Sequence, residues 1–340
     1  MATAGGLGGR RRPAPLLQSH RTGLQGMTGN RFPIRLPSSR RTFRLIIISL
    51  AFIALFPPIF FHFRLRRFHQ MRSRKCGWLN KPPLVCAHGG DSTNAFPNTM
   101  EAYRLALRSR ADCIEIDVSR SSDGALFALH DRELQRISGD NTSKVGFLSM
   151  EEIKELAVPH QSAAVQVFHD QTIPSIEDAL KLISSSVRQV ILDAKVGPPS
   201  YEKGLAKDIL SAVDRSKCKN CVVWAKSDSL ARDIIKLSSD ITVGYIVMVD
   251  PNTGKRMNLL RMKGAEVVGV YHPLIDEKLV RILHGRNNKV YAWTVDDEDS
   301  MRRMLFERVD AVVTSNPSLL QQIMQDIRTQ CREDGFSLSG

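Results

Sequence analysis

Apolar and polar positions alternate in two regular ways through the C-terminal two thirds of the chain. Short runs rich in β-branched residues are separated by stretches with the spacing of amphipathic helices. Short apolar strands that alternate with helices are typical of βα units around a parallel sheet buried on both faces. We predict strands at 84–87, 113–118, 190–193, 221–225, 242–247, 266–270, 289–294 and 310–314, with helices at 100–110, 175–185, 229–237, 277–284 and 297–306.

The number of these units predicts an α/β fold of the closed (β/α)₈ type, a TIM barrel. Eight βα units in about 240 residues match the size of this barrel, in which chemistry lies at the C-terminal ends of the strands. A doubly wound open sheet is the alternative, but no GxGxxG sequence follows the first strand. The long segment 119–189 contains Asp123-Gly124, which predicts a hairpin turn.

A different apolar pattern precedes the barrel. Residues 45–61 form a 17-residue run without a charge, which as a helix would rise about 26 Å against a hydrocarbon core of about 30 Å. Pro57 and Pro58 would kink this helix, a change that membrane helices tolerate. Arginine clusters on both sides favour a single-pass transmembrane helix at 45–63 over a buried core helix, and 44 preceding residues argue against a cleaved secretory signal.

The other segments follow from composition. Residues 1–44 are rich in Gly, Pro, Ser and Arg and predict a disordered basic arm. We expect a basic juxtamembrane linker at 64–81, the barrel at 82–325 and a C-terminal tail at 326–340. Basic residues on both sides leave the membrane orientation open, and an organelle transit peptide is an alternative reading of the N-terminus. Asn141-Thr142-Ser143 is a glycosylation sequon that matters only if the barrel faces a lumen.

Net charge initially indicates nucleic acid as a partner, but its distribution excludes that reading. The chain carries 48 Lys and Arg against 35 Asp and Glu, a net charge of +13. Residues 1–90 hold 16 of the basic residues and no acidic one, so residues 91–340 carry 32 against 35, a net of −3. The excess therefore flanks the apolar run, where it suits anionic lipid headgroups, and we expect a membrane partner and no nucleic acid.

The six cysteines do not predict a disulfide framework, because they are few and scattered. Cys86 and Cys113 lie inside apolar runs and are expected to act as small buried hydrophobic residues. Cys218 and Cys221 have CxxC spacing, but no further zinc ligands are evident, so a surface turn is the expectation. The redox compartment stays open on this basis.

Three acidic residues near the ends of two predicted strands indicate a metal site. Glu115 and Asp117 are two residues apart, so both carboxylates lie on one face of their strand, and Asp193 ends the next predicted strand. An unpaired charge in a buried parallel sheet is costly, which argues for a function. An all-oxygen ligand set favours Mg²⁺ or Ca²⁺ over zinc.

Further polar residues follow the same strand ends. His88 ends the first predicted strand and His130 closes the hairpin, and histidines beside a metal are natural general acid and base groups. Lys195 suits an anionic substrate, although it also has the spacing for an internal salt bridge with Asp193. Trp293 is compatible with both a pocket wall and a core position.

Several motifs in this region resemble the glycerophosphodiester phosphodiesterases, a TIM-barrel family of hydrolases. The resemblance covers about 85–317 and rests on 87–103 (AHGGDSTNAFPNTMEAY), 111–118 (ADCIEIDV), 123–131 (DGALFALHD), 173–180 (IPSIEDAL), 191–195 (ILDAK), 292–295 (AWTV) and 309–314 (VDAVVT). It implies cleavage of glycerophosphodiesters, such as glycerophosphocholine, to glycerol phosphate and an alcohol. It also implies a divalent cation on the three carboxylates, a His88–His130 acid/base pair and a phosphate contact by Lys195.

The chain departs from the family pattern at three positions. The family has His-Arg where this chain has His88-Gly89, and it thereby loses a guanidinium that would clamp phosphate. The family's Pro-Glu-Asn-Thr is replaced by a sequence with Pro97 at the Glu position, and the strand-end Glu has become Asp193. Three hypotheses follow: a membrane-anchored phosphodiesterase for glycerophosphodiesters, a related enzyme for lysophospholipids, or a catalytically silent barrel tethered to the membrane.

Overall fold

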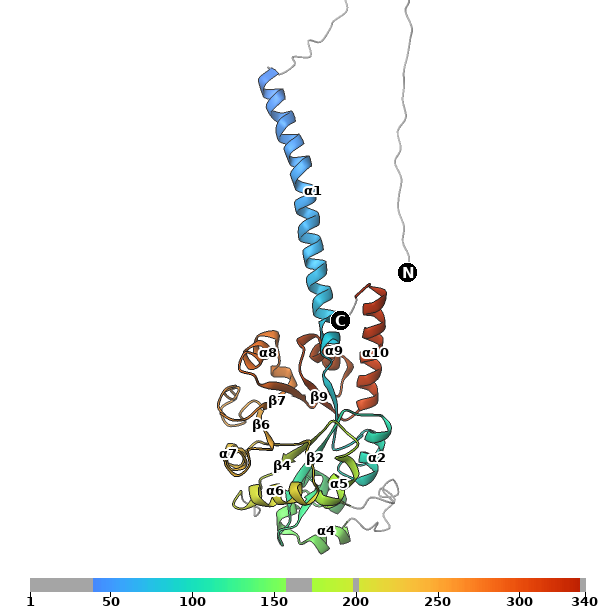
Figure 1. Ribbon diagram of the computed structural model, residues 1–340, viewed down its shortest axis with the longest axis vertical. Helices are drawn as coiled ribbons and strands as arrows, with labels where there is room; N and C mark the ends of the chain where they lie inside the picture. The colour runs from blue at the N-terminus through green and yellow to red at the C-terminus, as the bar shows by residue number, and fades with distance from the viewer. Residues whose placement is uncertain (1–38, 157–172, 198–201, 337–340) are drawn as a thin grey trace, which may run out of the picture. The chain divides into compact units, whose positions relative to one another are not determined.

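Eight parallel strands close into a ring. The computed structural model describes residues 39–156, 173–197 and 202–336, and Figure 1 shows helices outside the ring of strands. The first strand pairs in parallel with both the second and the last, so the eight strands form a closed ring and the doubly wound alternative is wrong. The barrel strands are β1 Leu84–His88, β2 Cys113–Arg120, β4 Gln189–Ala194, β5 Cys221–Ala225, β6 Thr242–Val247, β7 Val267–Tyr271, β8 Lys289–Trp293 and β9 Ala311–Thr314.

Amphipathic helices follow the strands and bury their apolar faces against them. Serine, threonine, aspartate or asparagine side chains cap most of these helices. Their oxygens accept hydrogen bonds from backbone N–H groups of the first turn, which have no partner within the helix. The helices are α2 Met100–Arg108, α5 Ile176–Ile183, α6 Leu205–Arg215, α7 Asp228–Leu237, α8 Glu277–His284, α9 Glu298–Glu307 and α10 Pro317–Glu333. The predicted TIM barrel is therefore confirmed.

The long segment after β2 forms a subsidiary layer. Strand β3 (Leu126–Ala128) pairs antiparallel with β2, as the Asp123-Gly124 turn predicts. It is followed by α3 (Asp131–Ser138) and α4 (Met150–Leu156), which bury a small cluster around Phe127 and Leu134. This hairpin delivers His130 to the end of the barrel.

Side chains fill the barrel interior below the strand ends. Trp224 is buried there and makes an edge contact with Tyr291. Gly269 leaves room for the indole, because a Cβ at this position would lie 2.7 Å from the ring. The interior is thus a packed core, and polar groups lie at the C-terminal ends of the strands.

The expectation for the cysteines is wrong. The structure pairs Cys76 with Cys331, Cys86 with Cys113, and Cys218 with Cys221. The folding of βα units brings scattered cysteines together, since parallel strands β1 and β2 set Cys86 directly opposite Cys113. The CxxC pair is a short disulfide loop and not merely a turn.

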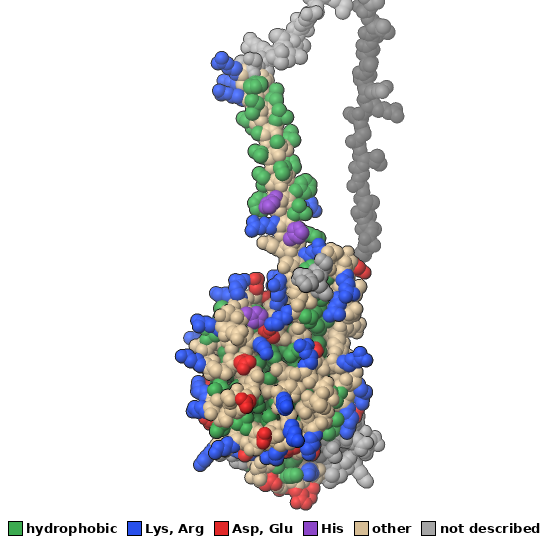
Figure 2. Space-filling model, viewed as in Figure 1, with side chains coloured by type: hydrophobic (Ala, Val, Ile, Leu, Met, Phe, Trp, Pro, Cys, Tyr) green, Lys and Arg blue, Asp and Glu red, His purple; other side chains and the backbone are tan. Residues whose placement is uncertain are grey.

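The chain divides into a unit at 1–63 and a unit at 64–340. Helix α1 (Ser39–Cys76) includes the predicted span, and among the described residues it is long and apolar enough to cross a membrane. Figure 2 shows its exposed hydrophobic side chains between basic ends. Most of the predicted arm lies outside the described residues. Helix α1 extends into the predicted linker, and α10 extends into the predicted tail.

Candidate active site at the C-terminal ends of the strands

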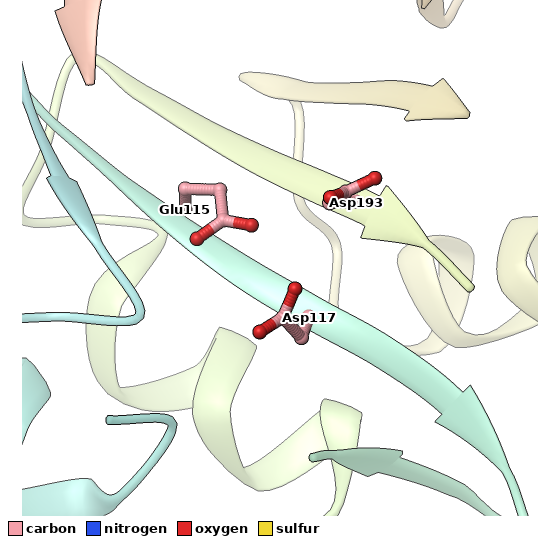
Figure 3. Close-up of side chains that lie close together, drawn as sticks. All are labelled: Glu115, Asp117 and Asp193. Carbon is pink, nitrogen blue, oxygen red and sulfur yellow. The ribbon is translucent and has the colours of Figure 1, made fainter. Parts of the chain in front are cut away.

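Three buried carboxylates meet at the ends of β2 and β4. Glu115 and Asp117 project from β2, and Asp193 projects from β4, where it is the register partner of Asp117 (Figure 3). Each offers an oxygen within 4.8 Å of the others. Their exposed fractions are only 1%, 1% and 8%. The parallel register of the sheet therefore brings the predicted acidic residues together.

Backbone and side-chain donors hold this acidic cluster in place. The Gly89 backbone N–H donates to Glu115 Oε2 at 2.8 Å. Asn98 Nδ2 donates to Asp117 Oδ2 at 2.8 Å, and its Oδ1 accepts from the Asp117 backbone N–H at 3.0 Å. Lys195 Nζ lies 2.6 Å from Asp117 Oδ1 and also donates to Asp193. The internal salt bridge considered for Lys195 thus exists, and it includes Asp117.

Burial and the neighbouring charges shift the pKa values of these groups in different directions. Burial raises the pKa of Glu115 well above its ordinary value, and the neighbouring Asp117 charge raises it further. Burial also opposes ionisation of Asp117, but Lys195 and the two histidines outweigh it and hold the pKa of Asp117 far below its ordinary range. Burial lowers the pKa of Lys195, but the surrounding carboxylates more than reverse this, so the pKa is raised and the ammonium stays charged.

The acidic cluster fits a divalent cation. Asp193 Oδ1 is a buried atom without a hydrogen bond among the described residues, whereas Asp117 Oδ1 has the Lys195 ammonium as its partner. A buried oxygen that lacks a donor is costly unless another partner satisfies it. Clustered carboxylate oxygens are ligands for Mg²⁺ and Ca²⁺, so the unpartnered Asp193 oxygen and the chemistry of the ligand set both agree with a cation at this position.

Two histidines flank the cluster. His88 ends β1 and is the register partner of Glu115. His130 caps α3, and its Nδ1 accepts from the Asp131 backbone N–H at 3.3 Å. A neutral imidazole with an accepting Nδ1 carries its proton on Nε2. Burial lowers the pKa of His88, and burial with the Lys195 charge lowers the pKa of His130 to about 4, so both rings are neutral at pH 7.

A cavity of about 70 Å³ lies between the cluster and the strand ends. Its wall includes His88, Glu115, His130, Asp193, Lys195 and Trp293, and Asp117 lies next to it as the partner of Lys195. The cavity is thus where the predicted site residues converge. The Trp293 indole N–H is buried and has no acceptor among the described residues, so it is available to a bound molecule.

Two cations in the same wall were missed by reasoning from the sequence. Arg132 and Lys226 line the cavity, and Lys226 Nζ lies 6.0 Å from the centre of the Trp293 ring. Lys226 directly follows β5, so it could have been found from the rule that functional residues of a TIM barrel lie at the C-terminal ends of the strands. Arg132 lies in the first turn of α3, whose path depends on the hairpin and is not visible in the strand pattern. Asn98, which orients Asp117, was likewise missed.

Two of the three departures from the family pattern, Gly89 and Pro97, lie against each other. Gly89 has φ of +62°, and a Cβ on it would lie 3.0 Å from Pro97 Cβ and 3.3 Å from the Asn98 backbone nitrogen. A longer side chain at Gly89 is therefore opposed by both the backbone conformation and the Pro97 ring. The changes at Gly89 and Pro97 form one altered loop after β1.

Comparison with known proteins places this site in a family. The sequence pattern of the glycerophosphoryl diester phosphodiesterase family matches residues 88–319. The glycerophosphodiester phosphodiesterase GDPD4 of Arabidopsis thaliana is 64% identical over 300 residues, which cover 88% of this chain and 91% of that protein. A glycerophosphodiester phosphodiesterase of Caldanaerobacter subterraneus is 28% identical over 246 residues, which cover 71% of this chain and 98% of that protein.

Solved structures show the same fold. A crystal structure described as a putative glycerophosphodiester phosphodiesterase from Galdieria sulphuraria aligns with a TM-score of 0.60 at 20% identity, covering 72% of this chain and 98% of that chain. A phosphodiesterase of Oleispira antarctica, in complex with the product sn-glycerol-3-phosphate, aligns with a TM-score of 0.59 at 23% identity, covering 72% and 97%. This chain therefore belongs to the glycerophosphoryl diester phosphodiesterase family of phosphoric diester hydrolases.

Proposed function

We propose that the protein hydrolyses glycerophosphodiesters to glycerol phosphate and an alcohol, with a divalent cation and a histidine pair. The observation that carries this proposal is one cavity that lies against a cluster of three carboxylates and is lined by two histidines and three cationic side chains. Carboxylates attract a cation, neutral imidazoles exchange protons, and ammonium and guanidinium groups bind phosphate. A silent barrel has no physical reason to keep these costly buried groups.

The cation would be held by Glu115, Asp117 and Asp193. Mg²⁺ and Ca²⁺ both suit three carboxylates, and when bound the ion would offset the negative charge of the phosphodiester. Lys195 balances part of the carboxylate charge and holds Asp117 ionised. Lys195 thereby keeps the cluster ready to accept the cation at neutral pH.

The two histidines would move the protons. His88 is neutral and takes a proton from the attacking water as its oxygen bonds to phosphorus. The negative phosphodiester would favour the imidazolium form of His130, which gives its Nε2 proton to the departing alkoxide as the phosphorus–oxygen ester bond breaks. His130 is then a neutral imidazole and His88 an imidazolium, and proton exchange with water restores the starting forms.

Arg132 and Lys226 would take over the phosphate contact of the family arginine. Both line the cavity beside Lys195. The forked donors of Arg132 can bind two phosphate oxygens, whereas Lys226 contributes a point charge. Trp293 offers an unpaired indole N–H at the same wall and would orient the glycerol or headgroup end.

The apolar helix α1 would anchor the enzyme in a membrane as a single span. Its exposed apolar side chains and basic flanks are those of a span with lipid on all sides. The substrate would be a water-soluble glycerophosphodiester. A lysophospholipid is the second candidate, because the altered loop at Gly89 and Pro97 changes the wall that the family uses for phosphate.

The test uses the full chain in detergent. Choline, the alcohol that both substrates release on hydrolysis, is measured from glycerophosphocholine and from lysophosphatidylcholine micelles, each with Mg²⁺, Ca²⁺ or EDTA. We expect cation-dependent release from the diester that falls by at least about 10²-fold in His88→Ala, His130→Ala and Glu115→Ala. His69→Ala and Glu298→Ala are matched controls at exposed positions away from the cavity, and they should keep full activity.

Other outcomes separate the candidates. Release from lysolipid micelles alone would replace the proposed substrate with the second candidate. Absence of turnover together with absence of cation binding, measured by calorimetry on the same preparation, would refute both enzyme proposals.

A further inference from the structure

Disulfide bonds account for every cysteine of the chain. The sequence has six cysteines, and all six are paired. The paired Cα atoms are 5.9, 4.4 and 5.7 Å apart, within the range that disulfides span. Cytosolic thiols are kept reduced, so structural disulfides are rare there and persist in the secretory lumen and outside the cell. Full pairing of six scattered cysteines therefore points to an oxidising compartment.

Two of the three pairs join parts of the chain that no short-range turn would bring together. Cys76 ends α1 and is bonded to Cys331 in α10, a separation of 255 residues. Cys86 and Cys113 link β1 to β2 two residues before His88 and Glu115. Both bridges are fully buried in the core. They fasten the ends of the barrel chain and the strands that carry the active site.

A separate motif indicates the same compartment. Asn141-Thr142-Ser143 is the one Asn-x-Ser/Thr sequence of the chain without a proline in the middle, since Asn316 is followed by Pro317. Asn141 lies on an exposed turn after α3. Asp140 shapes this turn by accepting from the Thr142 backbone N–H at 2.8 Å and from its hydroxyl at 2.7 Å. An exposed asparagine in a surface turn is accessible to the glycosylation machinery.

We infer that the barrel lies on the lumenal or extracellular side of the membrane and carries an N-linked glycan on Asn141. This inference adds to the proposed membrane anchor the side of the membrane on which the barrel lies. The basic residues on both sides of the apolar span leave that orientation open. It rests on that anchor but not on the proposed chemistry. Its readouts are a glycan and thiol reactivity, so it can fail while the phosphodiesterase activity stands, and the reverse.

The glycan is tested on the full chain expressed in eukaryotic cells. Digestion of the membrane fraction with peptide N-glycosidase should increase gel mobility by one glycan. Asn141→Gln and Ser143→Ala should abolish the shift. The controls Thr142→Ala and Ser143→Thr change the same turn but keep the sequon, so they should retain it.

A second reporter tests sidedness without Asn141. In the Asn141→Gln chain, Lys289→Thr creates an Asn-Asn-Thr sequence at 287–289, where Asn287 and Lys289 are exposed at the turn between α8 and β8. A lumenal barrel should regain one glycan. If only this reporter is glycosylated, the sidedness stands and the assignment to Asn141 is wrong.

Thiol labelling provides the remaining readout. The denatured protein is treated with a polyethylene-glycol maleimide before and after reduction, and we expect no label before reduction and six labels after it. Six reactive thiols before reduction, with no glycan on either sequon, would place the barrel in the cytosol and overturn the inference. Activity of Asn141→Gln serves to show that the unglycosylated chain folds.

Discussion

At the scale of single residues, Lys195 has two competing roles in the acidic cluster. Its ammonium lies among Asp117, Asp193 and Glu115, whose charges raise its pKa. The same ammonium lowers the pKa of Asp117 and so keeps a cation ligand ionised. It also occupies space beside the oxygens that a divalent cation would use. Under the proposed function, one side chain would therefore both prepare the cation site and compete with the cation.

Replacement of this residue should separate stability from cation affinity. Lys195→Met leaves buried carboxylates without their ammonium partner, which we expect to cost about 3–5 kcal/mol of unfolding free energy without added metal. Added Mg²⁺ or Ca²⁺ should raise the melting temperature of Lys195→Met more than that of the parent, while turnover falls. Lys207→Met, at an exposed position on α6, is the control. A smaller cation response in Lys195→Met would contradict the competition.

His130 should make stability depend on pH. Its pKa is about 4 in the folded protein against 6.5 unfolded. Between these values the unfolded chain binds more protons, so the free energy of unfolding should fall as pH decreases from 6.5 to 4 and level off below. Because the His130 ring is only half-buried, water screens its charge, and we expect the free energy of unfolding to fall by only about 1–2 kcal/mol. His88, whose pKa is also lowered, acts in the same direction.

The measurement is denaturant unfolding in EDTA across this pH range, comparing the parent with His130→Gln. The variant should lose part of the slope, because glutamine does not titrate. The exposed His69→Gln variant should keep the parent slope. An unchanged slope in His130→Gln would show that the ring is already solvated and charged in the folded protein.

At the scale of elements, the loop between β1 and α2 contains two of the three departures from the family, Gly89 and Pro97. Gly89 and Gly90 have positive φ, and a Cβ on Gly90 would lie 2.6 Å from the backbone of Ala102. Thr99 then caps α2 by accepting from the Ala102 backbone N–H. The tight loop sets Asn98 against Asp117, so its shape and the acidic cluster depend on each other.

This coupling is open to a double-mutant cycle. Gly89→Arg alone should destabilise the protein by about 1–3 kcal/mol, because the backbone has φ of +62° and Pro97 is in contact. Pro97→Glu removes the ring that a side chain at Gly89 would meet. The pair should therefore recover at least about 0.5 kcal/mol relative to the sum of the two single changes.

Unfolding of the four chains by denaturant measures the coupling, and glycerophosphocholine turnover reports whether the arginine assists. As a control, Gly124→Arg also has a positive φ but has nothing within 4 Å of its Cβ position, so it should show no coupling to Pro97→Glu. Additive energies at Gly89 and Pro97 would mean that the loop adapts freely.

At the scale of the whole molecule, the cavity of the proposed active site and the apolar span belong to different units. All the cavity residues lie within 64–340, whereas the apolar span lies mainly within 1–63. Ion pairs from Arg74 to Glu307 and from Lys81 to Asp310, together with the Cys76–Cys331 bond, tie the segment before β1 into the larger unit. The larger unit should therefore start before Cys76 to be stable.

Removal of residues 1–63 should abolish membrane attachment without changing the chemistry. The chain 64–340 should remain soluble in liposome flotation, whereas the full chain floats, and its turnover of glycerophosphocholine should equal that of the full chain in detergent. A full chain with Leu50→Asp and Phe52→Asp provides the matched control, since two charges at exposed positions in the span oppose insertion. Flotation of that control would point to attachment by other parts of the chain.

The order of the elements could be predicted from the sequence because it depends on local patterns. The strands at 221–225 and 242–247 coincide with β5 and β6, and the other predicted barrel strands differ by at most two residues at an end. The acidic residues, both histidines and Lys195 were also visible, since the barrel fold places strand ends in one ring. These inferences need only spacing and the rule that polar residues in buried strands are costly.

The tertiary structure alone decided which distant residues meet. Cys76 and Cys331 look unrelated along the chain, and the disulfide exists because α1 and α10 end at the same place. Arg132 enters the cavity because the hairpin turns α3 toward it, and Pro97 matters because it touches Gly89. Local periodicity carries no information on such contacts. The sequence by itself thus determined the barrel, the long apolar segment before it and the polar strand ends, whereas packing decided which residues meet.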